Sequence, residues 1–335
     1  MINVMIEYYL ARGLGYFLFI FFIFVGIYFI WKIIGKLLEN YFFEKDKMIV
    51  TKSKKQIISI TIGVLLIILL SSIYIVLSFK IMSPNIDEHV ISRNNNYLME
   101  IDHSIFGVYP TIWLQQSNNE LKPIIDMIVP FLIKIYFSLT LIINIMLFTL
   151  FIVKTRLCIH FICAFFLCPI FSMPFWYLFP ATSPVIAYWE PILFHEISTN
   201  IEVALSTYSP IFELEDIMQY VVNFRISERD TALFVTTIPS IHIAWGFLLA
   251  YYLTKLSKIL IFVAIPLFIA NSISTIITMQ HYAIDTVAGV LIAILAIYVT
   301  KLILNRYIYI FNPIVDLVEV DVKSVGKWLK GRNKT

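Results

Sequence analysis

Long apolar runs separated by short polar breaks follow one another along most of the chain. A run of about 18 or more apolar residues predicts a membrane-spanning helix, because a hydrocarbon core of roughly 30 Å takes about 20 helical residues. We find seven such runs, at residues 13–34, 56–79, 124–152, 157–179, 239–254, 259–280 and 283–304. The fifth is short, and the seventh begins almost where the sixth ends. The pattern predicts an all-α, polytopic membrane helical bundle with about six or seven transmembrane helices.

The composition agrees with this pattern. Of the 335 residues, 60% are hydrophobic and 14% are charged, and the mean hydropathy is +0.85. A soluble core of this size does not require so apolar a chain. Cys158, Cys163 and Cys168 all fall in one predicted span, which favours buried apolar side chains over a disulfide framework. The bilayer is therefore an expected partner, no nucleic acid is expected, and the oligomeric state stays open.

The distribution of basic residues predicts the orientation. One side of a seven-span chain holds 18 of its 25 Lys and Arg, in residues 32–55, 154–156, 255–258 and 301–335. By the positive-inside rule that side is cytoplasmic. The N-terminus and the two long loops, 80–123 and 180–238, are then extracytoplasmic. The second loop is long enough to contain short helices of its own.

These features divide the chain into three parts. Residues 1–80 form an N-terminal transmembrane helix pair, and the first span is not a cleaved signal, because no small-x-small cleavage site follows it. Residues 81–310 form a catalytic membrane domain with extracytoplasmic loops. Residues 311–335 space their apolar positions near a helical period and end in several basic residues, which predicts an amphipathic cytoplasmic tail on the anionic leaflet.

Two ionisable residues stand at the start of the last span, in the stretch MQHYAID at residues 279–285. If this stretch is helical, His281 and Asp285 lie on the same side, and the Asp285 carboxylate can accept a hydrogen bond from the imidazole. Such a bond fixes the ring tautomer and stabilises the positive charge that develops when the other ring nitrogen attacks an electrophile. Ionisable residues at membrane depth are costly and usually functional.

A second histidine lies on the same predicted membrane face. His242, in TTIPSIHIAW, lies at the outer end of the fifth span. It can protonate a departing oxygen and then take a proton from an incoming hydroxyl. Together the three residues predict a phosphoryl-transfer site with a phosphohistidine intermediate. Ser240, with Pro239 before it, is a plausible helix cap whose neighbouring N–H groups would face the phosphate.

Four residues are predicted substrate contacts: Ser240, Arg225, Arg229 and Tyr282. The two arginines lie in the outer loop and could clamp the donor phosphate, or they could be solvated, and Arg229 could pair with Glu228 or Asp230. His195 and Glu196 lack the HExxH spacing of a zinc helix, and His160 lies in a span that runs to the other face. We therefore predict no metal and no cofactor.

The segments IPSIH and HYAIDTVAG resemble the second and third signature motifs of the type 2 phosphatidic acid phosphatase superfamily. The resemblance implies a helical-bundle core that acts on lipid phosphates. It also implies that His281 is the nucleophile, that Asp285 orients it, and that His242 protonates the leaving group.

The chain departs from the phosphatase pattern where that pattern places cations. Thr275 stands at the position of the third-motif arginine, and the first motif is absent. A site with fewer fixed cations suits a phosphodiester donor, which carries less charge than a monoester. The segments 101–116 and 177–189 and the motif TIPSIHIAWG resemble those of the inositol phosphorylceramide synthase group, over residues 100–305. Sphingomyelin synthases share the two histidines and the aspartate.

The sequence thus predicts a lipid phosphotransferase with an extracytoplasmic active site. It would move a phosphoryl head group, such as inositol phosphate, from a glycerophospholipid to ceramide or a similar lipid hydroxyl. One alternative is a lipid phosphate phosphatase, in which water is the acceptor. Another is a proton-coupled transporter, although transporters tend to place such groups near the midplane of the membrane.

Overall fold

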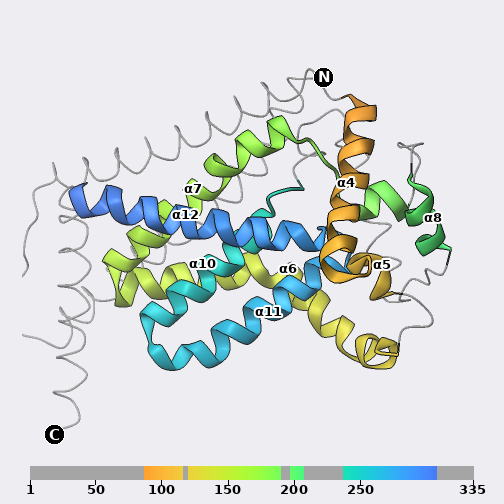
Figure 1. The fold of residues 1–335 in the computed structure, drawn as a ribbon. Helices are drawn as coiled ribbons and strands as arrows, with labels where there is room; N and C mark the ends of the chain where they lie inside the picture. The colour runs from red at the N-terminus through yellow and green to blue at the C-terminus, as the bar shows by residue number, and fades with distance from the viewer. Residues whose placement is uncertain (1–86, 116–119, 190–196, 207–236, 308–335) are drawn as a thin grey trace, which may run out of the picture. The chain divides into compact units, whose positions relative to one another are not determined.

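A computed structural model gives the fold, and it describes residues 87–115, 120–189, 197–206 and 237–307 (Figure 1). The described residues are largely helical and contain no β-strand, which confirms the all-α prediction. The predicted spans at 13–34 and 56–79 and the predicted tail at 311–335 lie outside the described residues.

Five of the described helices correspond to the predicted spans. They are α6 (Lys122–Val153), α7 (Thr155–Leu178), α10 (Ile241–Leu256), α11 (Ile261–Ile277) and α12 (Ala283–Tyr307), and the short 3₁₀ helix η5 (Lys258–Leu260) joins α10 to α11. Their bounds lie within a few residues of those predicted, because each apolar run ends at a polar break.

Among the described residues, four helical segments are long and apolar enough to cross a membrane, namely Pro123–Phe151, Thr155–Leu178, Lys258–Ile277 and Ala283–Arg306. The chain is therefore compatible with a multi-pass membrane protein. Helix α10 has 16 residues, about 24 Å at the rise of an α-helix, and is not among the four. The predicted total of six or seven spans is not confirmed.

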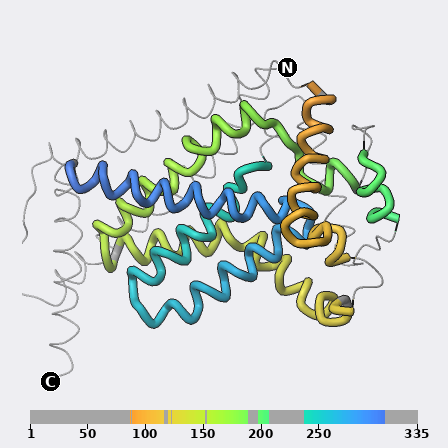
Figure 2. Tube along the Cα trace, in the orientation of Figure 1, coloured from red at the N-terminus to blue at the C-terminus, as the bar shows by residue number. Residues whose placement is uncertain are grey.

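Helix α10 packs against α6, α7, α11 and α12, as the tube view shows (Figure 2). Side chains from α6, α7, α10 and α12 form one buried apolar core. Within it the Trp245 ring stacks on Phe165 at 4.3 Å between centroids, and its Nε1 donates to the Phe165 carbonyl at 3.3 Å. On α11, by contrast, Phe262, Ile265 and Ile269 are exposed, as expected for a surface that faces lipid.

A second group of helices lies at one end of these five. It comprises α4 (Glu88–Phe106), α5 (Pro110–Trp113), the π-helix η3 (Val185–Trp189) and α8 (Thr199–Leu205). The sequence predicted short helices in the loop 180–238, and η3 and α8 are such helices. It treated 80–123 simply as a loop, however, and this segment contains the 19-residue helix α4.

Helix α4 has clear local signals at both ends. The Asp87 side chain accepts a hydrogen bond from the backbone N–H of His89 at 2.9 Å and caps the start. Gly107, with φ 71°, ends the helix in the left-handed conformation that glycine adopts most easily. Figure 1 shows α4 crossing the beginning of α12, so that α4 can support the residues there.

Buried amide side chains hold α4 and α5 in place. Asn95 and Thr182 exchange two hydrogen bonds, each 2.9 Å long. Gln115, just after α5, donates through Nε2 to the carbonyl of Ile277 at 2.7 Å, at the last residue of α11. Because a buried amide left unpaired is costly, these contacts fix α4 to the segment after α7 and the end of α5 to the end of α11.

Candidate active site

The turn between α11 and α12 carries His281. Helix α11 ends in a Schellman arrangement, in which the N–H of Met279 donates to the carbonyl of Ile276 and the N–H of Gln280 donates to that of Thr275, both at 3.0 Å. Met279 has a positive φ of 51°, a conformation that costs a non-glycine residue energy and that clusters at functional sites. The reversal brings His281 to the beginning of α12.

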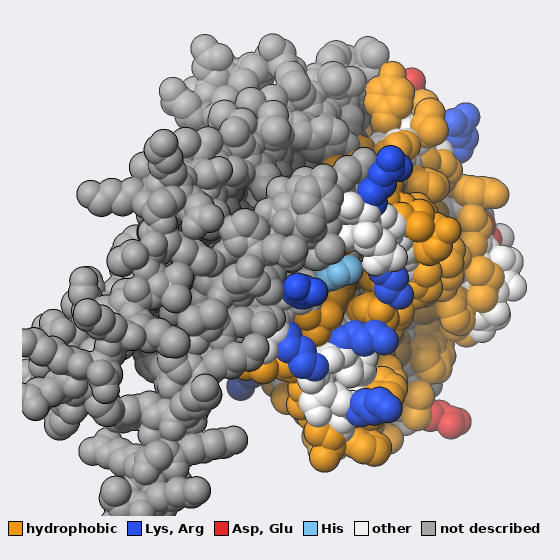
Figure 3. Space-filling view, turned by 90° about the vertical axis from the view of Figure 1, so that its left-hand side faces the viewer, with side chains coloured by type: hydrophobic (Ala, Val, Ile, Leu, Met, Phe, Trp, Pro, Cys, Tyr) orange, Lys and Arg blue, Asp and Glu red, His pale blue; other side chains and the backbone are white. Residues whose placement is uncertain are grey.

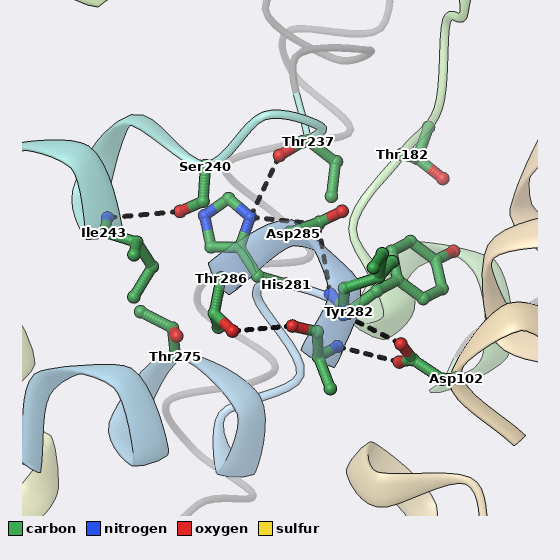
Figure 4. Close-up of polar contacts among 12 residues, drawn as sticks. Asp102, Thr182, Thr237, Ser240, Ile243, Thr275, His281, Tyr282, Asp285 and Thr286 are labelled. Carbon is green, nitrogen blue, oxygen red and sulfur yellow. Dashed lines mark hydrogen bonds and ion pairs between the residues drawn. The ribbon is translucent and has the colours of Figure 1, made fainter. Parts of the chain in front are cut away.

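The His281 ring faces two hydrogen-bond acceptors with one nitrogen. Its Nδ1 lies 3.1 Å from the carbonyl oxygen of Thr237 and 3.3 Å from Oδ2 of Asp285 (Figure 4). Since both neighbours accept, Nδ1 carries the hydrogen of the neutral ring, and Nε2 carries the lone pair. Figure 4 shows this second nitrogen on the side of Ser240, at the start of α10.

The His281–Asp285 contact does not arise from a shared helix, although the four-residue spacing predicts one. Helix α12 begins at Ala283, so His281 precedes it. Oδ2 of Asp285 accepts from the backbone N–H of Tyr282 at 3.1 Å, and the Asp285 N–H donates to the Tyr282 carbonyl at 3.1 Å. This reciprocal pairing resembles a capping box and bends the chain so that the carboxylate meets the imidazole. The contact was predicted correctly, but its cause is a helix cap.

His242 lies beside His281. Ser240 is the N-cap of α10 and accepts a hydrogen bond from the N–H of Ile243 at 3.3 Å, which places His242 in the first turn. The two imidazole rings are 6.0 Å apart between centroids. The Tyr136 ring of α6 stacks on His242 at 5.0 Å and 21°, which restricts the orientation of that imidazole. His242 is partly exposed, whereas His281 is only 6% exposed.

Close contact between α10 and α12 keeps the two histidines together. A Cβ atom on Gly289 would lie 2.6 Å from the carbonyl oxygen of Ser240 and 3.0 Å from Cβ of Ile243. No side chain fits there without a shift of the backbone. The last residue of the motif HYAIDTVAG is thus a glycine because α12 touches the beginning of α10 at this position.

Asp102 of α4 is a site residue that the sequence pattern does not predict. Its two carboxylate oxygens accept from the backbone N–H groups of Ala283 and Ile284 at 2.7 and 2.8 Å, so α4 supplies the cap for the first turn of α12 (Figure 4). Asp102 is completely buried, and burial raises its pKa to about 6, although the two N–H groups act in the opposite direction. No local signal could have shown this pairing, because the partners are 181 residues apart.

The other predicted contacts are placed differently. Tyr282 is completely buried in the core, where burial raises its pKa well above 10, so it supports the turn from within. Ser240 is completely buried as the N-cap of α10. Arg225, Arg229 and the pair His195 and Glu196 lie outside the described residues. Among the described residues, no group of three or more His, Cys, Asp or Glu could hold a metal ion.

Comparison with known proteins places this arrangement in a family. No curated protein and no solved structure matches the chain. The family model of the PAP2 superfamily matches residues 96–299, which are 204 of the 335 residues and include Asp102, both histidines, Asp285 and Gly289. The chain therefore belongs to the PAP2 superfamily, the type 2 phosphatidic acid phosphatase superfamily that its histidine motifs resemble.

Proposed function

We propose that this member of the PAP2 superfamily is a lipid phosphotransferase that works through a phosphohistidine on His281. Membership indicates phosphoryl-transfer chemistry, of the phosphatase or the phosphotransferase type. The observation that carries the proposal is the pair of acceptors at Nδ1 of His281, Thr237 O and Asp285 Oδ2, because they leave Nε2 as the nucleophilic nitrogen.

The first half-reaction breaks a phosphodiester. Nε2 of His281 attacks the phosphorus of a glycerophospholipid such as phosphatidylinositol, and an N–P bond forms as the bond from phosphorus to the diacylglycerol oxygen breaks. His242 gives its proton to that oxygen, and the Asp285 carboxylate stabilises the positive charge that forms on the His281 ring. Diacylglycerol leaves, and the head group stays on His281.

The second half-reaction restores the enzyme. His242, now neutral, removes the proton from the hydroxyl of ceramide or a similar lipid, whose oxygen attacks the phosphorus. The N–P bond breaks, and the new phospholipid carries the head group. No proton is gained or lost over the cycle. Arg225, Arg229 and the N–H groups of the first turn of α10, next to Ser240, would hold the phosphate oxygens in both steps.

The residue at position 275 supports a diester donor. Thr275 stands where the phosphatases have arginine, is completely buried in α11, and donates through Oγ1 to the Ser272 carbonyl at 2.8 Å. This position therefore supplies no cation for the second negative charge of a phosphomonoester. The same histidines and aspartate would serve a phosphatase equally well, so the choice between water and a lipid acceptor needs an experiment.

The experiment uses purified full-length protein in mixed micelles with head-group-labelled phosphatidylinositol and ceramide. We expect diacylglycerol and a new head-group-labelled phospholipid of ceramide, identified by mass spectrometry, and we expect neither with His281→Ala. Water-soluble inositol phosphate or phosphate without a new lipid would identify a phosphatase. If the His281→Ala variant turned over as fast as the wild type, the proposed nucleophile would be wrong.

A further inference from the structure

A hollow lies at the end of the helices away from His281. It has a volume of about 430 Å³ and is formed where α6 turns into α7, beside the last turn of α10. Its lining consists of Val153, Lys154, Arg156, Leu157, His160 and Lys255. His242 is in the first turn of α10 and Lys255 is in the last, so about 20 Å along this helix separates the hollow from the candidate active site.

Among the described residues, this end carries several cationic side chains and no acidic one. Figure 3 shows Lys and Arg side chains gathered around a histidine at this end of the helices. The cations at this end are Lys154, Arg156, Lys255, Lys258, Lys301 and Arg306. From residue 127 to 189 and from 237 to 307 the sequence has one acidic residue, Asp285, which belongs to the opposite end. Within the described ranges no carboxylate forms an ion pair with Arg156, Lys255 or Lys301. The field at the hollow therefore favours an anion.

The wall of the hollow is fixed by hydrogen bonds. Nζ of Lys154 donates to the carbonyls of Lys255 and Leu256 at 3.0 and 2.9 Å, and so ties the turn between α6 and α7 to the end of α10. These two carbonyls belong to the last turn of a helix, where acceptors lack partners within the helix. The cations in the lining therefore project from a backbone that is already ordered, as a binding site requires.

Two ammonium groups lie near the ring of Tyr251. Nζ of Lys255 lies 5.3 Å, and Nζ of Lys301 5.7 Å, from the centroid of the Tyr251 ring. The ring face attracts both cations, and within the described residues no carboxylate forms an ion pair with either of them. A bound anion would offset this positive charge. Val153 and Leu157 add an apolar edge to the same hollow, which a free inorganic anion would not use.

We propose that this hollow binds the phosphate group of an anionic phospholipid from the membrane leaflet at the basic end. Arg156 and Lys255 contact the phosphate oxygens, and Val153 and Leu157 contact the glycerol and the beginning of the acyl chains. The site lies across the bundle from His281, so the bound lipid is neither donor nor acceptor in the proposed reaction. The inference does not depend on that reaction.

The test uses the full-length protein in nanodiscs of phosphatidylcholine with a minor fraction of phosphatidylglycerol, and native mass spectrometry counts the bound lipid. Because phosphatidylglycerol is also a glycerophospholipid, its binding is measured in His281→Ala as well, where the proposed reaction cannot take place, and is expected to equal that of the wild type. The variant Arg156→Gln/Lys255→Gln should weaken the binding at least about tenfold. The charge-matched control Lys258→Gln/Arg306→Gln removes two cations of the same end outside the hollow and should weaken it less than about twofold.

A further variant tests whether loss of binding is due to misfolding instead of loss of the two charges. Arg156→Lys/Lys255→Arg keeps both charges and should retain phosphatidylglycerol. Equal loss in the glutamine variant and in its charge-matched control would show diffuse attraction to the surface and overturn the proposal. Wild-type affinity in the glutamine variant would also overturn it. Displacement of the lipid by an equal concentration of inorganic phosphate would overturn the assignment to a phospholipid.

Discussion

At the scale of single residues, the contact between Asp285 and His281 decides whether the imidazole can act as a nucleophile. Replacing Asp285 by Asn keeps the size of the side chain and one acceptor oxygen but removes the negative charge beside Nδ1. We expect turnover to fall about 10²- to 10⁴-fold, with little change in substrate affinity, because the charge stabilises a cation that exists only during the reaction.

Trapping of the intermediate tests this role directly. With head-group-labelled donor and no acceptor, the wild type should form an acid-labile, alkali-stable phosphoprotein, as expected for a phosphoramidate on histidine. Asp285→Asn should form it slowly, and His281→Ala should not form it. Rapid labelling of the Asn variant at the wild-type rate would contradict the role given to Asp285.

Asp102 acts on the same residues through the backbone. Replacing it by Ala leaves the N–H groups of Ala283 and Ile284 without their acceptors, which should cost about 1–3 kcal/mol of stability and lower the turnover number through misplacement of His281. Asp102→Asn retains one acceptor and should lose less. Asp87→Ala, which removes the cap of α4 at an exposed position, is the control and should leave turnover unchanged. Thermal unfolding and steady-state kinetics measure both effects.

Burial also makes the stability depend on pH through Asp102. Its pKa rises from 3.8 to about 6 in the folded protein, so the folded state binds this proton more tightly than the unfolded chain does. The stability contributed by the protonated group is therefore lost as the pH rises from about 4 to about 6, by about 3 kcal/mol in total, and is constant above that range. The unfolding temperature of the wild type minus that of Asp102→Asn should be greatest near pH 4 and should fall as the pH rises to about 6. A difference between the two proteins that did not change with pH would contradict this assignment.

The sequence was informative about residues where the chemistry is local. The contact between His281 and Asp285 could be predicted because the partners are four positions apart, and Ser240 because N-cap residues are recognisable from their type and place. Asp102 and Thr237 escaped prediction because their partners lie 181 and 44 residues away. Contacts of this kind depend on tertiary packing, and single-sequence patterns carry no information about it.

At the scale of helices, the fit between α10 and α12 sets the distance between the two histidines. Gly289→Ala puts a methyl group 2.6 Å from a backbone oxygen, so one of the helices must move. We expect activity to fall at least about tenfold and stability to fall by about 1–3 kcal/mol. The control is Gly246→Ala in α10, whose new Cβ would meet the end of the Asn271 side chain at 2.8 Å. Because a side chain can turn away, this control should retain more activity, and equal losses in the two variants would refute the specific role of Gly289.

The helices differ in how well the sequence reveals them. Spans such as α6 and α12 could be predicted within a few residues, because an apolar run of that length has no other stable conformation in lipid. Helix α4 was missed because polar residues such as Asn94, Asn95 and Asn96 interrupt its apolar pattern. All three asparagines bond to the segment after α7, Asn94 to Pro180, Asn95 to Thr182 and Asn96 to Tyr188. Asparagine is present at these positions because its amide group makes these tertiary hydrogen bonds, and the same polar side chains weaken the helical pattern in the sequence.

At the scale of the whole molecule, the two ends of the helices carry different chemistry, and this difference predicts how the protein lies in the membrane. The end with Lys154, Lys255 and Lys301 should face the cytoplasm by the positive-inside rule, and the end with His242 and His281 should face the other compartment. Each end has an exposed serine that can be labelled. Ser257, between α10 and η5, lies at the basic end, and Ser104, in the last turn of α4, lies at the end with His281. In a background with Cys158, Cys163 and Cys168 replaced by Ala, each serine is changed to Cys in turn. A membrane-impermeant maleimide should label the Ser104→Cys variant in intact cells and the Ser257→Cys variant only after permeabilisation. The reverse pattern would place the candidate active site in the cytoplasm, where His281 would meet lipids of the inner leaflet.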